Sequence, residues 1–177
     1  MIMREGVRLA LDWGGVRIGV AACDRSAILA FPVTTLSASG DVWGSLASLV
    51  ADYEPLEVLV GLPVALSGRE ELAAAQVTGV AREVAARLAP VPVRLVDERL
   101  SSAAAHRSLA SAGRGSRSRR AVIDQAAAVA ILEHALTFEQ RTGSPPGRLV
   151  DAGPSGERRP DGPDLAAGPV TDVRTPE

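Results

Sequence analysis

The 177-residue sequence has one cysteine, no lysine, 3% aromatic residues and no long apolar run. The single cysteine, Cys23, excludes an internal disulfide and a cysteine-built zinc site, and its apolar neighbours predict a buried small side chain. No apolar run approaches the ~20 residues that cross a bilayer, and the N-terminus lacks the apolar core of a signal peptide. We therefore expect a cytoplasmic protein without a membrane partner.

The scarcity of aromatic residues argues against a protein that reads single strands by stacking their bases. Apolar residues make up 46% of the chain, which is enough for a hydrophobic core, and the length favours one domain. Residues 141–177 hold seven prolines, six glycines and no aromatic residue. They predict a disordered tail behind a folded unit of residues 1–140.

The apolar patterns of this unit predict a mixed sheet flanked by helices. Gly14-Gly15 predicts a hairpin between the first two strands, and Pro32 places the third strand at an edge or an irregularity. The expected strands are 7–12, 17–22, 30–35, 57–62 and 91–97, and the expected helices are 41–52, 69–88, 101–111 and 119–138.

Carboxylates stand where apolar surroundings make a charge costly. Asp12 ends the first strand, Asp97-Glu98 ends the fifth, and Asp124 lies in the apolar last helix. Small alanines in that helix allow it to approach the sheet and bring Asp124 near Asp12 and Glu98. Asp97 and Glu98 point to opposite faces, so one of the two lines this site directly. Taken singly, each carboxylate fits a structural role as well as it fits a functional one.

Three converging carboxylates repel one another unless a hard cation such as Mg²⁺ or Mn²⁺ lies between them. Two such ions clamp a phosphodiester and activate a water for in-line attack. Residues 99–123 contain six arginines and no acidic residue, a composition that suits phosphate binding but also fits a solvated loop. Four of these arginines gather just before Asp124, namely Arg114, Arg117, Arg119 and Arg120.

Four short motifs together resemble the YqgF/RuvX-type family, described as Holliday junction resolvases and as nucleases that mature the 5′ end of pre-16S rRNA. The resemblance is collinear over about residues 7–136 and does not cover the tail. The motifs are Leu11-Asp12-Trp13-Gly14 with Arg17-Ile18-Gly19-Val20-Ala21, Val60-Gly61-Leu62-Pro63 with Ser67-Gly68, Asp97-Glu98-Arg99-Leu100-Ser101, and Ile123-Asp124-Gln125-Ala126-Ala127-Ala128 with Ile131-Leu132.

This resemblance implies an α/β, RNase H-like fold with a mixed five-stranded sheet flanked by helices. It implies metal-dependent phosphodiester hydrolysis, with the family's acidic residues falling on Asp12, Glu98 and Asp124 and with Asp97 supporting. Ala65 and Ser67 stand where the family often has Asn and Asp, which affects substrate contact rather than the metal site. Arg119 or Arg120 replaces a usual lysine and preserves phosphate binding.

The leading hypothesis is a Mg²⁺- or Mn²⁺-dependent nuclease that processes the 5′ end of pre-16S rRNA, with Arg17 and the 114–120 segment contacting phosphates. One alternative is a Holliday junction resolvase that acts on branched DNA with the same residues. A resolvase should be a homodimer in order to cut two strands, whereas an RNA nuclease works as a monomer or a homodimer. A non-catalytic RNase H-like binding module is a further alternative. A sugar kinase or actin-like ATPase is disfavoured because the chain is too short and lacks a second glycine-rich phosphate loop.

Overall fold

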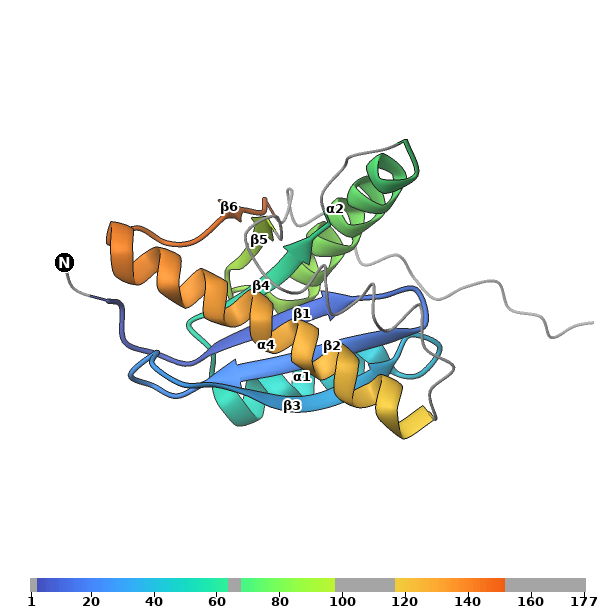
Figure 1. Ribbon diagram of the computed structural model, residues 1–177, viewed down its shortest axis with the longest axis horizontal. Coiled ribbons are helices and arrows are strands. Elements are labelled where there is room, and N and C mark those ends of the chain that lie inside the picture. Colours follow the sequence, from blue (N-terminus) through green and yellow to red (C-terminus); the bar gives the residue numbers. More distant parts are fainter. Residues whose placement is uncertain (1–2, 64–67, 98–116, 152–177) are drawn as a thin grey trace, which may run out of the picture.

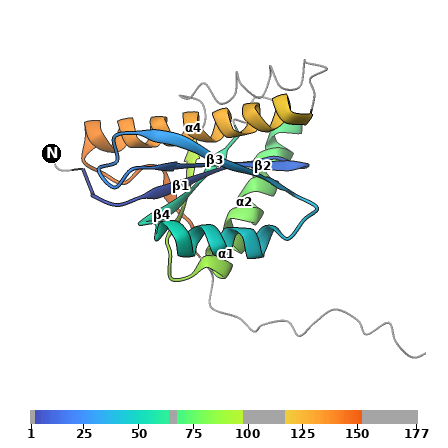
Figure 2. The same cartoon turned by 90° about the horizontal axis from the view of Figure 1, so that it is seen from below.

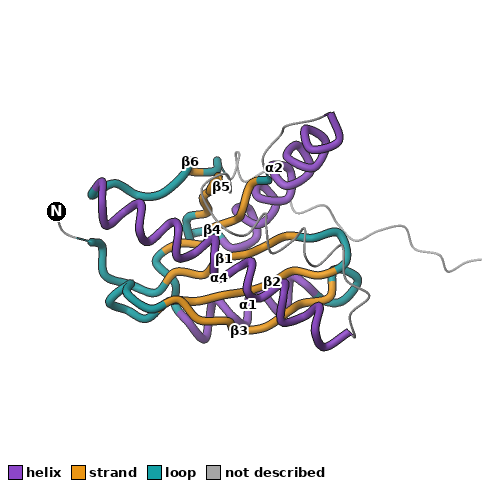
Figure 3. Tube along the Cα trace, viewed as in Figure 1, coloured by secondary structure: helices purple, strands orange, loops and turns teal. Residues whose placement is uncertain are grey.

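The computed structural model describes residues 3–63, 68–97 and 117–151. Helices flank a single six-stranded mixed sheet, with strand order β3-β2-β1-β4-β5-β6 (Figure 3). The strands are β1 (Arg8–Trp13), β2 (Arg17–Cys23), β3 (Ala30–Ser37), β4 (Glu57–Leu62), β5 (Val93–Asp97) and β6 (Arg148–Leu149), and the helices are α1 (Val42–Tyr53), α2 (Gly68–Leu88) and α4 (Arg117–Thr142). The predicted fold class is confirmed, but the sheet has six strands rather than five.

The sheet separates two layers of helices (Figures 1 and 2). Helix α4 crosses one face, and α1 and α2 cover the other. Each face has its own apolar cluster: Ala10, Leu59 and Val96 pack with α4, whereas Leu9 and Leu11 pack with residues of α1 and α2. Alternation along each strand therefore decides which helix layer a side chain meets.

The strand directions bring the carboxyl ends of three strands to one edge of the sheet. β1 and β2 form the predicted antiparallel hairpin, while β1, β4 and β5 run parallel. After β1 the chain turns toward β2, and after β4 it continues toward β5, so the connections diverge between β1 and β4. Such a divergence leaves a crevice where open α/β sheets bind ligands.

Strand β3 lies at the edge of the sheet, as Pro32 predicts. The β2–β3 register shifts between Val20 and Ala21, next to the position where Ala21 pairs with Pro32. A proline has no N–H to donate to the ladder, so an edge strand with a bulge accommodates it. Both parts of the prediction for this strand are confirmed.

Helix α4 packs along one face of the sheet (Figure 2). By length and composition Arg120–Thr142 is apolar enough to span a bilayer, with a mean hydropathy of 1.3. Its residues Ala127, Ala128 and Leu132 are fully buried in the cluster that covers the sheet. Because this apolar stripe packs on the protein's own sheet, α4 is a core helix.

The folded chain continues past the boundary expected at residue 140. Helix α4 ends at Thr142, and β6 then pairs antiparallel with β5 through Arg94 and Leu149. Gly147 has a φ of 63°, and a Cβ there would lie 2.1 Å from the Leu95 carbonyl oxygen, so only glycine allows this close turn. The helix expected at 101–111 lies outside the described residues.

Candidate active site

Asp12 is a buried carboxylate near the carboxyl end of β1. It is 4% exposed, and it shares a strand face with Ala10, which packs against α4. Its neighbour across the hairpin is Gly19 of β2. Asp12 also has interactions with its surroundings, as the cost of burying a carboxylate requires. The side chain therefore lies under α4 at the edge where β1, β4 and β5 end.

Gly19 lets the backbone of α4 rest directly on β2. A Cβ at Gly19 would lie 2.0 Å from the carbonyl oxygen of Asp124 and 2.5 Å from its carbonyl carbon. No side chain fits into that space. Because Gly19 pairs with Asp12, the missing side chain brings the Asp124 segment of α4 next to Asp12. The structure thus gathers two of the three predicted acidic residues at one place.

Arg17 pairs with Asp124 across the same contact. Its Nε donates a 2.5 Å hydrogen bond to Oδ2 of Asp124, and the two side chains are 27% and 16% exposed. Arg17 shares a strand face with Gly19, so it reaches α4 from the sheet. Its two Nη groups make no hydrogen bond to another described residue. Arg17 therefore orients Asp124 from the sheet.

Thr35 and Gln125, two polar residues to which the sequence prediction gave no role, form hydrogen bonds that hold the first turns of α4 on β3. The hydroxyl of Thr35 on β3 donates to the Ala121 carbonyl oxygen at 2.9 Å. The Gln125 amide donates to the Thr35 hydroxyl at 3.2 Å. Thr35 pairs with Gly19, so these bonds lie beside the close contact. The sequence gives little sign of these two bonds, because they depend on the pairing of Thr35 in the edge strand β3 with Gly19 in β2.

The remaining predicted residues fall in different places. Asp97 ends β5 opposite Leu62, and alternation from Leu95 puts it on the α2 side of the sheet, away from Asp12. Val96 faces α4 instead. Glu98 and Arg114 lie outside the described residues. Arg117, Arg119 and Arg120 belong to the first turn of α4, where Arg120 is exposed and no acidic residue is present.

A second charged cluster, which sequence reasoning missed, lies at the opposite end of the α4 face. Three arginines meet two glutamates there, and Arg8, Glu57 and Glu139 are at most 2% exposed. Arg4 donates to Glu57 at 2.6 Å and to Glu139 at 2.7 Å. Arg8 binds Glu139 at 3.0 Å, and Arg94 binds Glu57 at 2.9 Å. These pairs tie β1, β4, β5, α4 and the N-terminal segment together.

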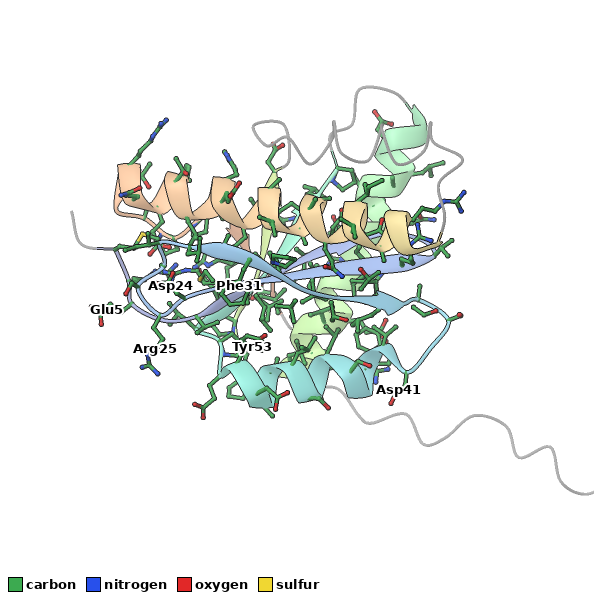
Figure 4. The ribbon with its side chains drawn as sticks, turned by 60° about the horizontal axis from the view of Figure 1, so that its bottom comes forward. Glu5, Asp24, Arg25, Phe31, Asp41 and Tyr53 are labelled. Atoms are coloured by element: carbon green, nitrogen blue, oxygen red, sulfur yellow. The ribbon has the colours of Figure 1, made fainter. Side chains whose placement is uncertain are left out.

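Two carboxylates at that far end, those of Glu139 and Asp24, have lowered pKa values. Burial opposes the ionisation of Glu139, but the hydrogen bonds from Arg4 and the charge of Arg8 outweigh it and lower the pKa of its carboxyl. Backbone N–H groups of Leu29 and Ile28 lower the pKa of Asp24 in the β2–β3 turn. Figure 4 shows Asp24 at the opposite end of the molecule from Asp41, which caps the N-terminus of α1. These carboxylates stabilise the fold and do not mark the site.

The chemistry of the site suits a hard cation. Asp12 and Asp124 supply carboxylate oxygens, the ligands that Mg²⁺ and Mn²⁺ prefer. Among residues 3–63, 68–97 and 117–151 no group of three His, Cys, Asp or Glu side chains forms a metal cluster. The third predicted carboxylate, Glu98, lies outside those ranges. The donor types therefore fit such an ion, with two of the three predicted ligands described.

Comparison with solved structures supports the fold. Thermus thermophilus RuvC, solved in complex with a Holliday junction substrate, superposes with a TM-score of 0.54 and 18% identity, covering 81% of this chain and 99% of that one. RuvC has the RNase H-like fold. The α/β, RNase H-like architecture is thereby confirmed.

Sequence comparison defines the family. A protein of Cutibacterium acnes, named provisionally as a pre-16S rRNA nuclease, is 58% identical over 131 residues, which are 74% of this chain and 82% of that protein. A relative from Thermobifida fusca with the same name is 50% identical over 159 residues, 86% of this chain and all of its own length. The RuvX family model, described as Holliday junction resolvase, matches residues 6–137. The chain therefore belongs to the RuvX family of phosphodiester-hydrolysing nucleases.

Proposed function

We propose that this protein is a divalent-metal-dependent nuclease that processes the 5′ end of pre-16S rRNA. The observation that carries the proposal is the contact of α4 with Gly19, which brings the Asp124 segment next to the buried Asp12. A carboxylate under a helix at the carboxyl edge of a sheet is costly unless it serves chemistry or has a fixed partner. The two relatives named above supply the RNA assignment.

The proposed metal ligands are Asp12, Asp124 and Glu98, for Mg²⁺ or Mn²⁺. When bound, such an ion activates water and stabilises the charge that develops on the phosphate. The described residues prepare the site for it. Gly19 fixes where α4 lies, and Arg17 holds one carboxylate oxygen of Asp124 by a 2.5 Å bond. Asp97 supports the same edge from the other face of the sheet.

Phosphate binding is proposed for Arg17 and for the arginines at 114–120. Arg117, Arg119 and Arg120 stand in the first turn of α4 with no acidic residue among them. The N-terminus of a helix already carries partial positive charge, so arginines there cost stability unless an anion binds. Arg17 adds two Nη donors beside Asp124. A polyanionic backbone that passes Asp124 would meet both groups.

A second candidate function is resolution of branched DNA. It is favoured by the description of the matching family and by the likeness to a RuvC that was solved with a Holliday junction. Symmetric cutting of a junction requires a homodimer, whereas RNA cleavage is compatible with a monomer. The substrate and the oligomeric state therefore discriminate the two functions together. We place either activity in the cytoplasm.

Cleavage of two labelled substrates tests the proposal: a pre-16S rRNA fragment that contains the 5′ precursor sequence, and a four-way DNA junction. Each is incubated with Mg²⁺, with Mn²⁺ or with EDTA. We expect metal-dependent cleavage of the RNA by the wild type and none by Asp124→Asn. Glu133→Gln, an exposed position on the same helix, is the matched control and should cleave normally.

Three outcomes contradict the proposal. Normal cleavage by Asp124→Asn removes the catalytic assignment. Selective cutting of the junction by a homodimer transfers the function to DNA. Binding of either substrate without cleavage under any metal favours the non-catalytic RNase H-like module. Analytical ultracentrifugation of the same samples gives the oligomeric state.

A further inference from the structure

An apolar cavity lies on the opposite face of the sheet from Asp124, at the same edge. It has a volume of about 580 Å³, within the ~300–1,000 Å³ typical of ligand sites. Its walls include the turn Trp13–Gly15 after β1, Pro63 after β4, and Val77 and Val80 of α2. The cavity therefore occupies the crevice where the connections from β1 and β4 diverge.

Consecutive residues of β1 connect this cavity to the active site. Asp12 faces α4, and Trp13, the next residue, lines the cavity on the α2 side. Their Cα atoms are ~3.8 Å apart because a trans peptide joins them. A polynucleotide that crosses this edge can place a phosphate beside Asp12 and an adjoining base in the cavity. The cavity and the proposed catalytic site thus lie on opposite faces of the sheet at the same edge.

Trp13 presents a supported aromatic surface to the cavity. Its ring packs on Trp43 of α1 with centroids 5.9 Å apart, and the Arg87 guanidinium lies 4.4 Å from the centroid of the Trp43 ring. Trp13 lines the cavity, whereas Trp43 is not among its lining residues. A flat group that enters the cavity can pack on the Trp13 ring.

The lining selects the chemistry of the occupant. Among the described residues, the walls of the cavity hold no Asp, Glu, Arg or His side chain, so this surface favours an uncharged occupant over an ion. The polar side chain on these described walls is that of Gln76, an exposed amide with both donor and acceptor groups. An uncharged flat ring with hydrogen-bonding edges matches this combination.

We propose that this cavity binds one unpaired nucleobase of the substrate, next to the cleaved phosphodiester, by stacking it on Trp13. The proposal rests on the proposed nuclease function and adds a specificity element to it. Cleavage would then require an unpaired or extrudable nucleotide beside the cleaved bond. With one aromatic ring in the cavity wall, the scarcity of aromatic residues limits stacking to a single base.

The cavity can be filled without disturbing Trp13. Gly79 lines it, and a Cβ at Gly79 would meet nothing within 4 Å. Gly79→Leu therefore projects a side chain into open space and raises the helix propensity of α2. The matched control is Ala75→Leu, an exposed position of the same helix that does not line the cavity. Equal or higher Tm values than wild type verify that both variants are folded.

Fluorescence and anisotropy in EDTA test the proposal without cleavage. Trp43→Phe leaves Trp13 as the only tryptophan of the chain. The probes are a short single-stranded RNA and an abasic strand with the same number of phosphates. We expect the RNA, but not the abasic strand, to quench Trp13. Gly79→Leu should weaken RNA binding by about five- to a hundredfold, as for loss of one base stack, and leave abasic binding unchanged.

The outcomes separate base binding in the cavity from the nuclease function. Equal quenching of Trp13 by both strands overturns the proposal that the cavity binds a base. Equal RNA affinities of Gly79→Leu and Ala75→Leu overturn it as well. If the wild type still cleaves the RNA, the proposed nuclease function stands. A protein that binds neither strand overturns both. Normal cleavage by Asp124→Asn overturns the proposed catalytic function on its own.

Discussion

Replacing Gly19 by alanine puts a methyl group where the backbone of α4 now lies. The new Cβ would lie 2.0 Å from the Asp124 carbonyl oxygen, whereas real Cβ contacts are essentially never under 3.0 Å. The obstructing atoms are backbone atoms of a helix, which cannot rotate away. Helix α4 must therefore move from β2 by about 1 Å, and Asp124 moves with it relative to Asp12.

This displacement should affect activity more than stability. Overpacking of this kind costs about 1–3 kcal/mol of unfolding free energy. A ~1 Å misplacement of reacting groups costs about a hundredfold in rate. We expect Gly19→Ala to remain folded by circular dichroism, with a Tm lower by roughly 3–12 °C, and to cleave the RNA about a hundredfold more slowly at a temperature well below that Tm.

Gly40→Ala is the matched control for this experiment. Gly40 is an exposed residue between β3 and α1, and a Cβ there would make only ordinary contacts, 3.4 Å from the carbonyl oxygen of Ser37 and 3.6 Å from its Cβ. Its rate should equal that of the wild type. If Gly19→Ala cleaves as fast as Gly40→Ala while both are folded, the contact of α4 with β2 does not position a catalytic group and the reasoning is refuted.

Three further predictions concern the surroundings of the site. Glu139→Gln removes one of the two carboxylates that neutralise Arg4 and the buried Arg8, leaving Glu57 to serve both, and should cost about 3–5 kcal/mol in urea unfolding. Because the folded-state pKa of Glu139 is lowered, wild-type stability should fall as the pH drops below the usual glutamate value of ~4.3, and the variant should lose this part of the dependence. A pH profile identical to that of the wild type would contradict this. Thr35→Val removes the bonds to α4 and should cost about 1 kcal/mol in the same assay, with no change counting against that role. Burial raises the pKa of the Cys23 thiol, so a thiol reagent at neutral pH should label it in denaturant and not in the native protein, whereas fast native labelling would be inconsistent with its burial.

Local pattern was sufficient to predict most of the elements. The Gly14-Gly15 hairpin and the edge position of the Pro32 strand follow from turn residues, and the structure confirms them. The mixed sheet follows from the order of apolar runs, and the antiparallel β1–β2 pair and the parallel β4–β5 pair confirm it. Strand β6 was not predicted from the sequence. A two-residue strand in a segment rich in proline and glycine forms only where β5 offers a free edge.

The candidate site was predictable in its residues and less so in its contacts. The alanines of α4 indicated a close approach, and Ala127 and Ala128 are fully buried. The close contact, however, depends on Gly19 of β2, in the sheet that α4 packs on, which only the packed structure reveals. Arg17 was assigned to phosphates from sequence, and its bond to Asp124 is a contact between residues 107 positions apart.

The charged cluster at the far end shows the same limit. Arg8 and Glu57 are buried charges inside strands that sequence patterns describe as apolar. Glu139, which pairs with Arg8, lies 131 residues after it. No local signal connects such positions, because the burial of each charge is compensated only after the sheet and α4 have assembled.

The most direct measurement is the single-turnover cleavage rate of Asp12→Asn, Asp124→Asn and the double variant on the pre-16S rRNA fragment in Mg²⁺. The two carboxylates are proposed to act as one unit, so each single variant should lose about a hundredfold or more, and the double variant should be no slower than the slower single one. Wild-type rates in either single variant, or small losses that simply add in the double variant, would contradict a shared catalytic centre at Asp12 and Asp124.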